Sequence, residues 1–160
     1  MIHHKFDTET HVYFYENEFY PLSNFSAFRL KWKGLDFDTS EHAYHWEKFV
    51  SPSRHEALLA IQQQIMQARS AHEAFKIAER YGQLRRADWL TIRLDTMRSI
   101  LQAKVEQHEY VRRKLLETGD RLLIEDSWRD AYWGWGQHED GANMLGKLWM
   151  EIRTELRKEE

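Results

Sequence analysis

The sequence contains no cysteine. A protein without thiols has no disulfide framework, no thiolate zinc site and no cysteine nucleophile. The side chains left to carry chemistry are therefore those of aspartate, glutamate, histidine, lysine, serine and tyrosine.

Long apolar runs are also missing. No stretch approaches the roughly 18 consecutive apolar residues of a membrane span. The start, Met1-Ile2-His3-His4-Lys5, lacks the apolar core of a secretory signal. We therefore expect a cytoplasmic protein with no membrane partner.

An excess of positive charge is absent as well, because 23 Lys and Arg face 26 Asp and Glu, for a formal charge of −3. No global positive field gathers polyanions, so any nucleic-acid contact has to be local. No glycine run follows a predicted strand at the spacing of a Walker or dinucleotide phosphate loop. Kinases and Rossmann enzymes are thereby excluded, and no cofactor is expected.

What is present is enough apolar material for one folded domain. The 160 residues are 42% hydrophobic and 14% aromatic, which disfavours disorder and a two-domain chain. The patterns predict a mainly helical α+β single domain over residues 1–160, with a small N-terminal β-sheet. Strands are expected at 11–15, 28–33 and 121–125, with a hairpin turn at 33–36, and helices at 41–50, 54–67, 71–81, 89–108, 110–117 and 143–156.

The first predicted helix crowds ionisable groups among aromatic residues. Thr39 or Ser40 stands where an N-cap belongs. Glu41, His45 and Lys48 fall on adjoining turns, so their side chains share a face. This pattern is typical either of a surface stripe of ion pairs or of a functional cluster, and the residues alone leave both open.

Two further segments stand out. Asn24 lies in a polar loop, 22–26, where it is either a turn residue or a ligand contact. The loop 130–136 combines aromatic residues with glycines ahead of a helix that begins near Asn143. Such a loop can wall a pocket and offer N–H groups to an anion, or it can be an aromatic corner packed for stability.

The nine histidines raise the question of a metal site. His42 and His45 are three residues apart on one helix, but the pattern is not that of a zincin and no third ligand stands out. We therefore predict no metal.

The ordered motifs resemble one family over nearly the whole chain. They are Leu22-Ser23-Asn24-Phe25, Thr39-Ser40-Glu41-His42 with Lys48-Phe49, Leu84-Arg85-Arg86-Ala87-Asp88-Trp89, Ala103-Lys104, Asp130-Ala131-Tyr132-Trp133-Gly134 and Asn143-Met144-Leu145-Gly146. This set resembles the NADAR superfamily, and within it the YbiA-like N-glycosidases that act on riboflavin biosynthesis intermediates.

The resemblance implies a hydrolase that cleaves the bond between C1 of a phosphorylated ribose and an exocyclic amine of a heterocycle. The expected substrates are early riboflavin-pathway phosphoribosylamino-pyrimidines. One alternative is removal of ADP-ribose from guanine bases, and nucleic acid is a partner only as that modified substrate. Another is a non-catalytic module that binds ADP-ribose or NAD. The oligomeric state stays open.

The resemblance also assigns catalytic roles. A glycosylamine can open to an imine, which a lysine can capture as a Schiff base. Lys48 is the predicted nucleophile, because aromatic neighbours would lower the pKa of its amine, and Glu41 is the predicted proton shuttle. Asp130 is predicted to stabilise the cationic intermediate and orient water. Glu41 and Asp130 could instead serve as acid and base of a direct hydrolysis.

Substrate-binding roles follow from the same motifs. Amides are expected to bind ribose or base edges, aromatic rings to stack on the heterocycle, a glycine to let the backbone approach, and cations to hold phosphate. The predicted set is Asn24, Phe25, His42, Arg86, Trp89, Lys104, Trp133, Gly134 and Asn143.

Four positions depart from the family pattern. His45 and Glu47 stand where glutamine is expected, Arg93 where lysine is usual, and Trp135 where a small acidic residue often follows Trp-Gly. Trp135 can close over a small metabolite or supply a stacking surface for a nucleic-acid base. The leaving base is therefore not defined by the motifs.

Overall fold

The computed structural model describes residues 4–160, so Met1–His3 of the start considered above lie outside the described residues. The chain divides into two compact units. The terminal unit combines the chain up to Ser23 with His108–Glu160, and the inserted unit is Asn24–Gln107. Each is described by itself, and the prediction of one domain over 1–160 stays a prediction.

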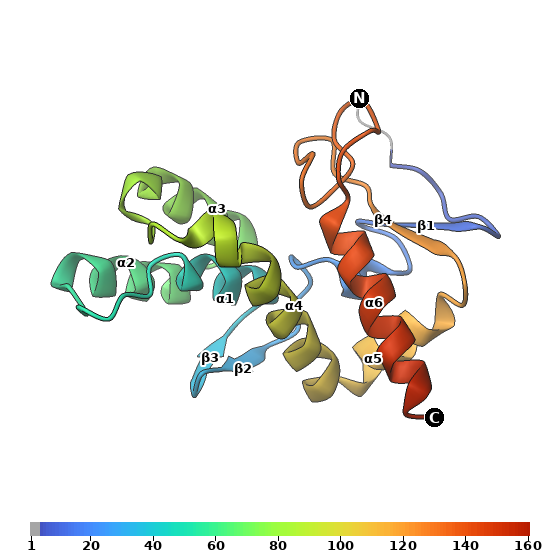
Figure 1. Cartoon of the computed structure of the whole chain (residues 1–160), viewed down its shortest axis with the longest axis horizontal. Coiled ribbons are helices and arrows are strands. Elements are labelled where there is room, and N and C mark those ends of the chain that lie inside the picture. The colour runs from blue at the N-terminus through green and yellow to red at the C-terminus, as the bar shows by residue number, and fades with distance from the viewer. Residues whose placement is uncertain (1–3) are drawn as a thin grey trace. The chain divides into compact units, whose positions relative to one another are not determined.

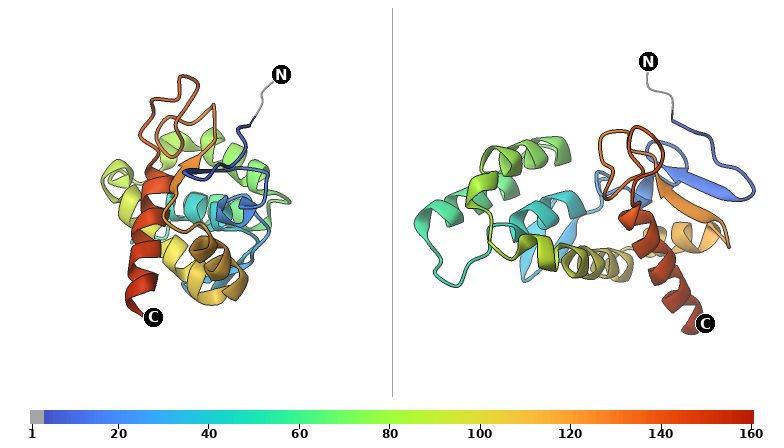
Figure 2. Two further views of the ribbon diagram at one scale, coloured as in Figure 1. Left: turned by 90° about the vertical axis from the view of Figure 1, so that its right-hand side faces the viewer. Right: turned by 45° about the horizontal axis from the view of Figure 1, so that its top comes forward.

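The terminal unit is built on two parallel strands. Strand β1 (His11–Phe14) pairs with β4 (Leu122–Glu125), with His11 opposite Leu122, and the two lie side by side in Figure 2. Helix α6 (Met144–Lys158) packs against β4, and α5 (Glu109–Glu117) packs against α6 and the short helix η1 (Tyr20–Leu22). The indole of Trp149, fully buried, donates to the Leu22 carbonyl at 2.8 Å, which ties α6 to η1.

The inserted unit begins with a hairpin. Strand β2 (Leu30–Trp32) pairs antiparallel with β3 (Leu35–Phe37). Lys33 and Gly34 form the two-residue turn, both with positive φ (50° and 79°), as the twist of a tight hairpin requires. The side chain of Gln107 donates to and accepts from the backbone of Lys31 at 2.8 Å, so it replaces a neighbouring strand at the edge of β2.

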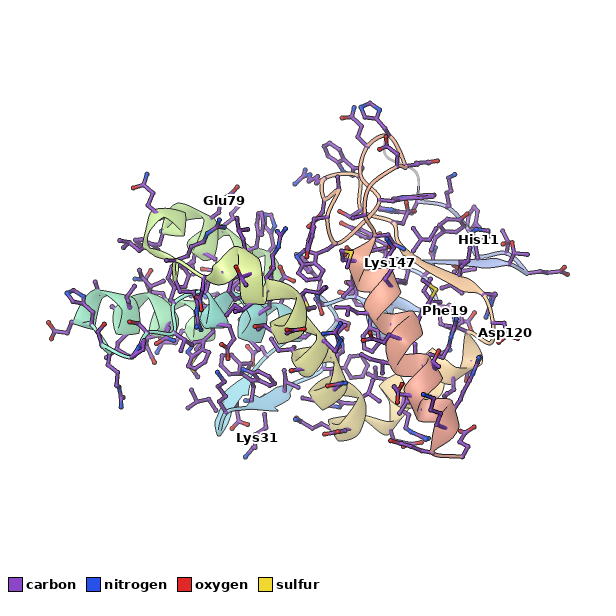
Figure 3. The ribbon with its side chains drawn as sticks, viewed as in Figure 1. His11, Phe19, Lys31, Glu79, Asp120 and Lys147 are labelled. Atoms are coloured by element: carbon purple, nitrogen blue, oxygen red, sulfur yellow. The ribbon has the colours of Figure 1, made fainter. Side chains whose placement is uncertain are left out.

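Four helices complete the inserted unit (Figure 1): α1 (Ser40–Glu47), α2 (Glu56–Gln67), α3 (Ala71–Arg80) and α4 (Trp89–Gln107), with a 3₁₀ turn, η2 (Gly82–Leu84), before α4. Helices α1, α2 and α3 pack against one another, and α4 packs on α1 and β2. Their shared core is apolar and consists of Phe49, Ile61, Ile65, Ala68, Ala74, Ile77 and Ala78. Glu79, labelled in Figure 3, projects from the opposite, exposed face of α3.

The predicted mainly helical α+β class is confirmed. The predicted helices and strands are all present, with shifted ends, and the small sheet consists of two separate strand pairs. The largest shift is in α1, which ends at Glu47 rather than at residue 50. The N–H groups of Lys48, Phe49 and Val50 bond three residues back, so the last turn tightens. Lys48 is consequently the C-cap of α1.

Close packing of α6 on β4 depends on a glycine. A Cβ atom at Gly146 would lie 2.0 Å from the Leu123 carbonyl oxygen of β4. We expect Gly146→Ala to lower the free energy of unfolding by about 3 kcal/mol, because backbone must move to admit the methyl group. Urea unfolding measures the change.

Gly82→Ala is the matched control, because no atom lies within 4 Å of the added Cβ. Its expected effect is within about 0.5 kcal/mol. If Gly146→Ala and Gly82→Ala lowered the free energy of unfolding equally, close packing at Gly146 would not be the cause.

Candidate active site

Helix α1 carries the predicted catalytic stripe, and its N-terminus is held by the 22–26 loop. The Thr39 hydroxyl accepts from the His42 N–H at 3.2 Å, as an N-cap does. The Asn24 carbonyl accepts from the Glu41 N–H at 3.2 Å, and the Asn24 side-chain oxygen accepts from the Ser40 hydroxyl at 2.8 Å. Asn24, buried, is thus a structural anchor of α1 in this unit, and its substrate role stays a prediction.

Glu41 and His45 are in contact one turn apart. Glu41 Oε1 lies 2.6 Å from His45 Nε2. His45 is 2% exposed, and this burial lowers the pKa of its imidazole, against the opposing effect of Glu41. Lys48 lowers it further. The pair therefore joins a carboxyl group to an uncharged imidazole near neutral pH.

Lys48 lies among aromatic rings at the end of α1. Its Nζ is 5.2 Å from the centre of the Tyr44 ring and 5.8 Å from that of the Trp89 ring, and the two rings are 5.1 Å apart. Trp89, 2% exposed, begins α4. The predicted pairing of Lys48 with an aromatic environment is present, and Tyr44, which was not among the predicted site residues, forms part of it.

His42, predicted to bind substrate, is fully buried. Its Nε2 lies 3.0 Å from the Ala68 carbonyl, which can only accept, so Nδ1 accepts the Thr39 hydroxyl at 2.7 Å. Both ring nitrogens are thus bonded within the unit, where they connect α1 to the end of α2. Binding to substrate would require one of these bonds to break.

The two predicted phosphate ligands are also engaged. The guanidinium of Arg86 makes a two-bond ion pair with Asp88, at 2.6 and 3.0 Å, while its backbone N–H donates to the Lys48 carbonyl. Lys104 lies on the apolar face of α4, fully buried, where Nζ donates to the Ser26 hydroxyl at 2.9 Å and lies 5.5 Å from the Phe28 ring. Burial lowers the pKa of Lys104 to about 7. Phe25, by contrast, is 40% exposed, and its substrate role stays a prediction.

Glu47, one of the departures from the family pattern, is nearly fully buried. Its Oε1 accepts from the Trp32 indole at 2.7 Å and from Lys33 Nζ at 2.8 Å. The carboxylate therefore fastens the β2–β3 hairpin to α1.

The remaining predicted residues belong to the terminal unit. Asp130 Oδ1 accepts from the backbone N–H groups of Tyr132 and Trp133, at 2.8 and 2.7 Å, and so shapes the aromatic loop. A Cβ at Gly134 would lie 2.9 Å from the carbonyl oxygens of Asp130 and Glu125, so this glycine is required by close backbone packing. Trp133 is 9% exposed and contacts the Tyr132 ring edge-on. The catalytic role of Asp130 stays a prediction.

Two other side chains of this unit have structural partners. The Asn143 amide accepts from the Glu125 N–H and donates to the Leu123 carbonyl, both at 2.9 Å, along the edge of β4. The Trp135 indole donates to Asp126 at 3.0 Å and lies 5.3 Å from the Tyr13 ring. Asp126, which was not among the predicted site residues, also accepts from the Lys5 N–H at 2.8 Å.

No group of three or more histidine, aspartate or glutamate side chains is arranged to hold a metal ion within residues 4–160. Over the same residues no helix has the length and apolar character needed to cross a membrane.

Comparison with known proteins places the chain in a family. The model of the NADAR domain matches residues 13–157. The chain belongs to the NADAR family.

Curated relatives within this family are named N-glycosidases. N-glycosidase YbiA of Escherichia coli (strain K12) is 34% identical over 150 residues, covering 94% of this chain and 89% of that protein. An N-glycosidase of Nostoc punctiforme is 34% identical over 148 residues, covering 91% and 92%. A riboflavin biosynthesis protein of Vibrio vulnificus is 35% identical over 153 residues, but this chain spans only 40% of its length.

The NADAR fold of this chain also matches a solved structure. The NMR structure of Escherichia coli YbiA superposes with a TM-score of 0.80 at 33% identity, covering 96% of this chain and 88% of that one. The family resemblance predicted from the motifs is therefore confirmed.

The buried lysine makes stability depend on pH. Between pH 7 and its ordinary value of 10.5, Lys104 is neutral when folded and protonated when unfolded, so the unfolded state binds more protons and stability rises with pH. We expect the free energy of unfolding to rise by up to about 1.4 kcal/mol per pH unit more in the wild type than in Lys104→Met. Urea unfolding of both proteins at pH 7 and pH 9 measures this difference in pH dependence.

Lys147→Met, at an exposed position on α6 (Figure 3), is the matched control and should keep the wild-type pH dependence. If Lys104→Met also kept the wild-type pH dependence of stability, the assignment of Lys104 as a buried, largely neutral amine would be wrong.

Proposed function

We propose that this NADAR protein hydrolyses the C1–N bond between a phosphorylated ribose and an exocyclic amine of a heterocycle. The proposed substrates are early phosphoribosylamino-pyrimidines of riboflavin biosynthesis. The names of the N-glycosidase and riboflavin relatives support this class of reaction. Within the chain, the observation that carries the proposal is the arrangement of carboxyl, imidazole and amine groups along one face of α1.

That arrangement follows from helical geometry. Glu41 and Lys48 are seven residues apart, which is two turns and about 10 Å along the axis, so they lie on the same face. Tyr44 and His45 occupy the turn between them. A carboxyl group and an amine thus lie beside a pair of largely buried aromatic rings, Tyr44 and Trp89.

The proposed reaction uses both ends of this face. The glycosylamine opens to an imine at C1 with a proton transferred to the ring oxygen. The Lys48 amine then adds to C1, and the Glu41 carboxylate takes a proton from the added amine and passes it to the heterocyclic amine, which leaves. Water hydrolyses the lysine imine, which frees the sugar aldehyde and restores the amine. In a direct hydrolysis, Glu41 would instead activate the water.

Two alternatives remain as outcomes of a test. The modest charge of −3 favours a small metabolite over extended nucleic acid, although one ADP-ribosylated guanine could be held by its own pyrophosphate. A module that only binds ADP-ribose or NAD has no use for a nucleophile and a proton donor on one face. The combination of Glu41 and Lys48 therefore favours an enzyme.

We expect the purified protein to release the free aminopyrimidine from an early riboflavin intermediate faster than it releases ADP-ribose from ADP-ribosylated guanine DNA. Chromatography of both mixtures, with EDTA present because no metal is predicted, measures the rates. Faster turnover of the DNA would reverse the assignment of substrate, and binding of ADP-ribose without turnover of either would indicate a binding module.

A covalent intermediate on Lys48 is a separate prediction. Borohydride added during turnover should reduce the imine and leave a ribose-phosphate adduct on Lys48, located by peptide mass. Lys48→Ala should abolish the adduct and reduce kcat by at least about 100-fold. Lys48→Arg should fail as well, because a guanidinium stays protonated and cannot form the imine.

Lys76→Ala, an exposed lysine on α3, is the control and should be trapped and active like the wild type. An adduct that maps to Lys104, or near-normal turnover by Lys48→Ala, would remove Lys48 as the nucleophile. The hydrolytic function could then still proceed through Glu41.

A further inference from the structure

The imidazole of His45 holds one oxygen of Glu41, and the reaction proposed above leaves this contact unused. The two atoms are 2.6 Å apart, His45 is 2% exposed, and Glu41 has only 12% of its side chain exposed. Within residues 4–160, the other ring nitrogen, Nδ1, has no hydrogen-bond partner although it is buried. The ring therefore has one polar contact, and that contact is with the predicted proton shuttle.

The surroundings of His45 are mainly aromatic. On α1 the Tyr44 ring lies 5.2 Å away, and on α3 the Phe75 ring lies 5.8 Å away, both edge-on. His72 of α3 stacks on the far side of the pair, at 6.2 Å from Phe75. The titratable groups acting on the imidazole from α1 are Glu41, Lys48 and His42, of which only Glu41 favours a positive charge.

This environment selects one protonation state. A second proton would have to reside on Nδ1, buried without an acceptor and close to Lys48, so the ring holds a single proton. An ionised Glu41 can only accept, which places that proton on Nε2, directed at Oε1. Oε1 is thereby held in place by this bond, and Oε2 is the oxygen outside the contact with His45.

We propose that His45 is a positioning residue that fixes the Glu41 carboxylate, with Oε1 held by Nε2–H and Oε2 presented for proton transfer. The inference rests on the proposed N-glycosidase function. His45 itself need not touch the substrate. Its contribution is to restrict rotation of the carboxyl group by donating to one of its oxygens.

The test compares two substitutions on the riboflavin intermediate. His45→Phe keeps a flat ring between Tyr44 and Phe75 but removes the donor, and we expect kcat to fall by about 10- to 100-fold while KM changes less than about threefold. His45→Gln, which keeps an N–H donor, should recover most of kcat.

Phe75→Leu is the packing control, because it alters the apolar contact with the imidazole and leaves the donor in place. Its kcat and KM should match those of the wild type. If His45→Phe left kcat unchanged, or if Phe75→Leu lowered kcat equally, His45 would have only a packing role and the proposal would be wrong.

Nitrogen NMR of the wild-type resting protein supplies a readout that needs neither turnover nor a folded variant. His45 should show the Nε2–H tautomer and stay neutral below pH 6.5, the ordinary pKa of histidine. The Nδ1–H tautomer, or an ordinary titration, would overturn the inference. If the wild type turned over neither substrate, the proposed function would be wrong. If the wild type were active and His45→Phe had the same kcat, only the role of His45 would be wrong.

Discussion

The attachment of the α1 N-terminus to the loop at Asn24 is the constraint on which the candidate site depends. Thr39 and Asn24 supply acceptors for N–H groups that no residue inside the helix can satisfy. Once the first turn is fixed in this way, the helical repeat sets the direction of every later side chain. Glu41 and His45 then lie one turn apart and in contact, and Lys48 follows at the C-cap, where the last turn tightens.

Much of this arrangement could be predicted from the sequence. A Thr-Ser cap followed by ionisable residues at helical spacing defines α1 and its face, and turn residues such as Lys33-Gly34 define the hairpin. Propensity and periodicity describe a helix by itself, however. They give no account of which acceptor on another element a side chain meets. The spacing therefore did not show that His42 bonds the end of α2 whereas His45 bonds Glu41.

Long-range pairing explains why the sequence could not indicate the structural partners of other predicted residues. The Asn143 amide follows the edge of β4, a strand 18 residues earlier in the chain. Lys104 continues the apolar stripe of Met97, Ile100 and Leu101 on α4, and that spacing could have indicated its burial. The substrate-binding roles of Asn143 and Lys104 stay predictions.

Burial gives the polar groups of the inserted unit different capacities for chemistry. His42 has both ring nitrogens bonded to groups of the fold. His45 has one bond, to a carboxyl group, and aromatic rings elsewhere. In the reaction proposed above, a proton would move between Glu41 and a ligand while the imidazole stays neutral and in place. The same low polarity that makes a second proton on His45 unfavourable would then keep the carboxylate oriented through the transfer.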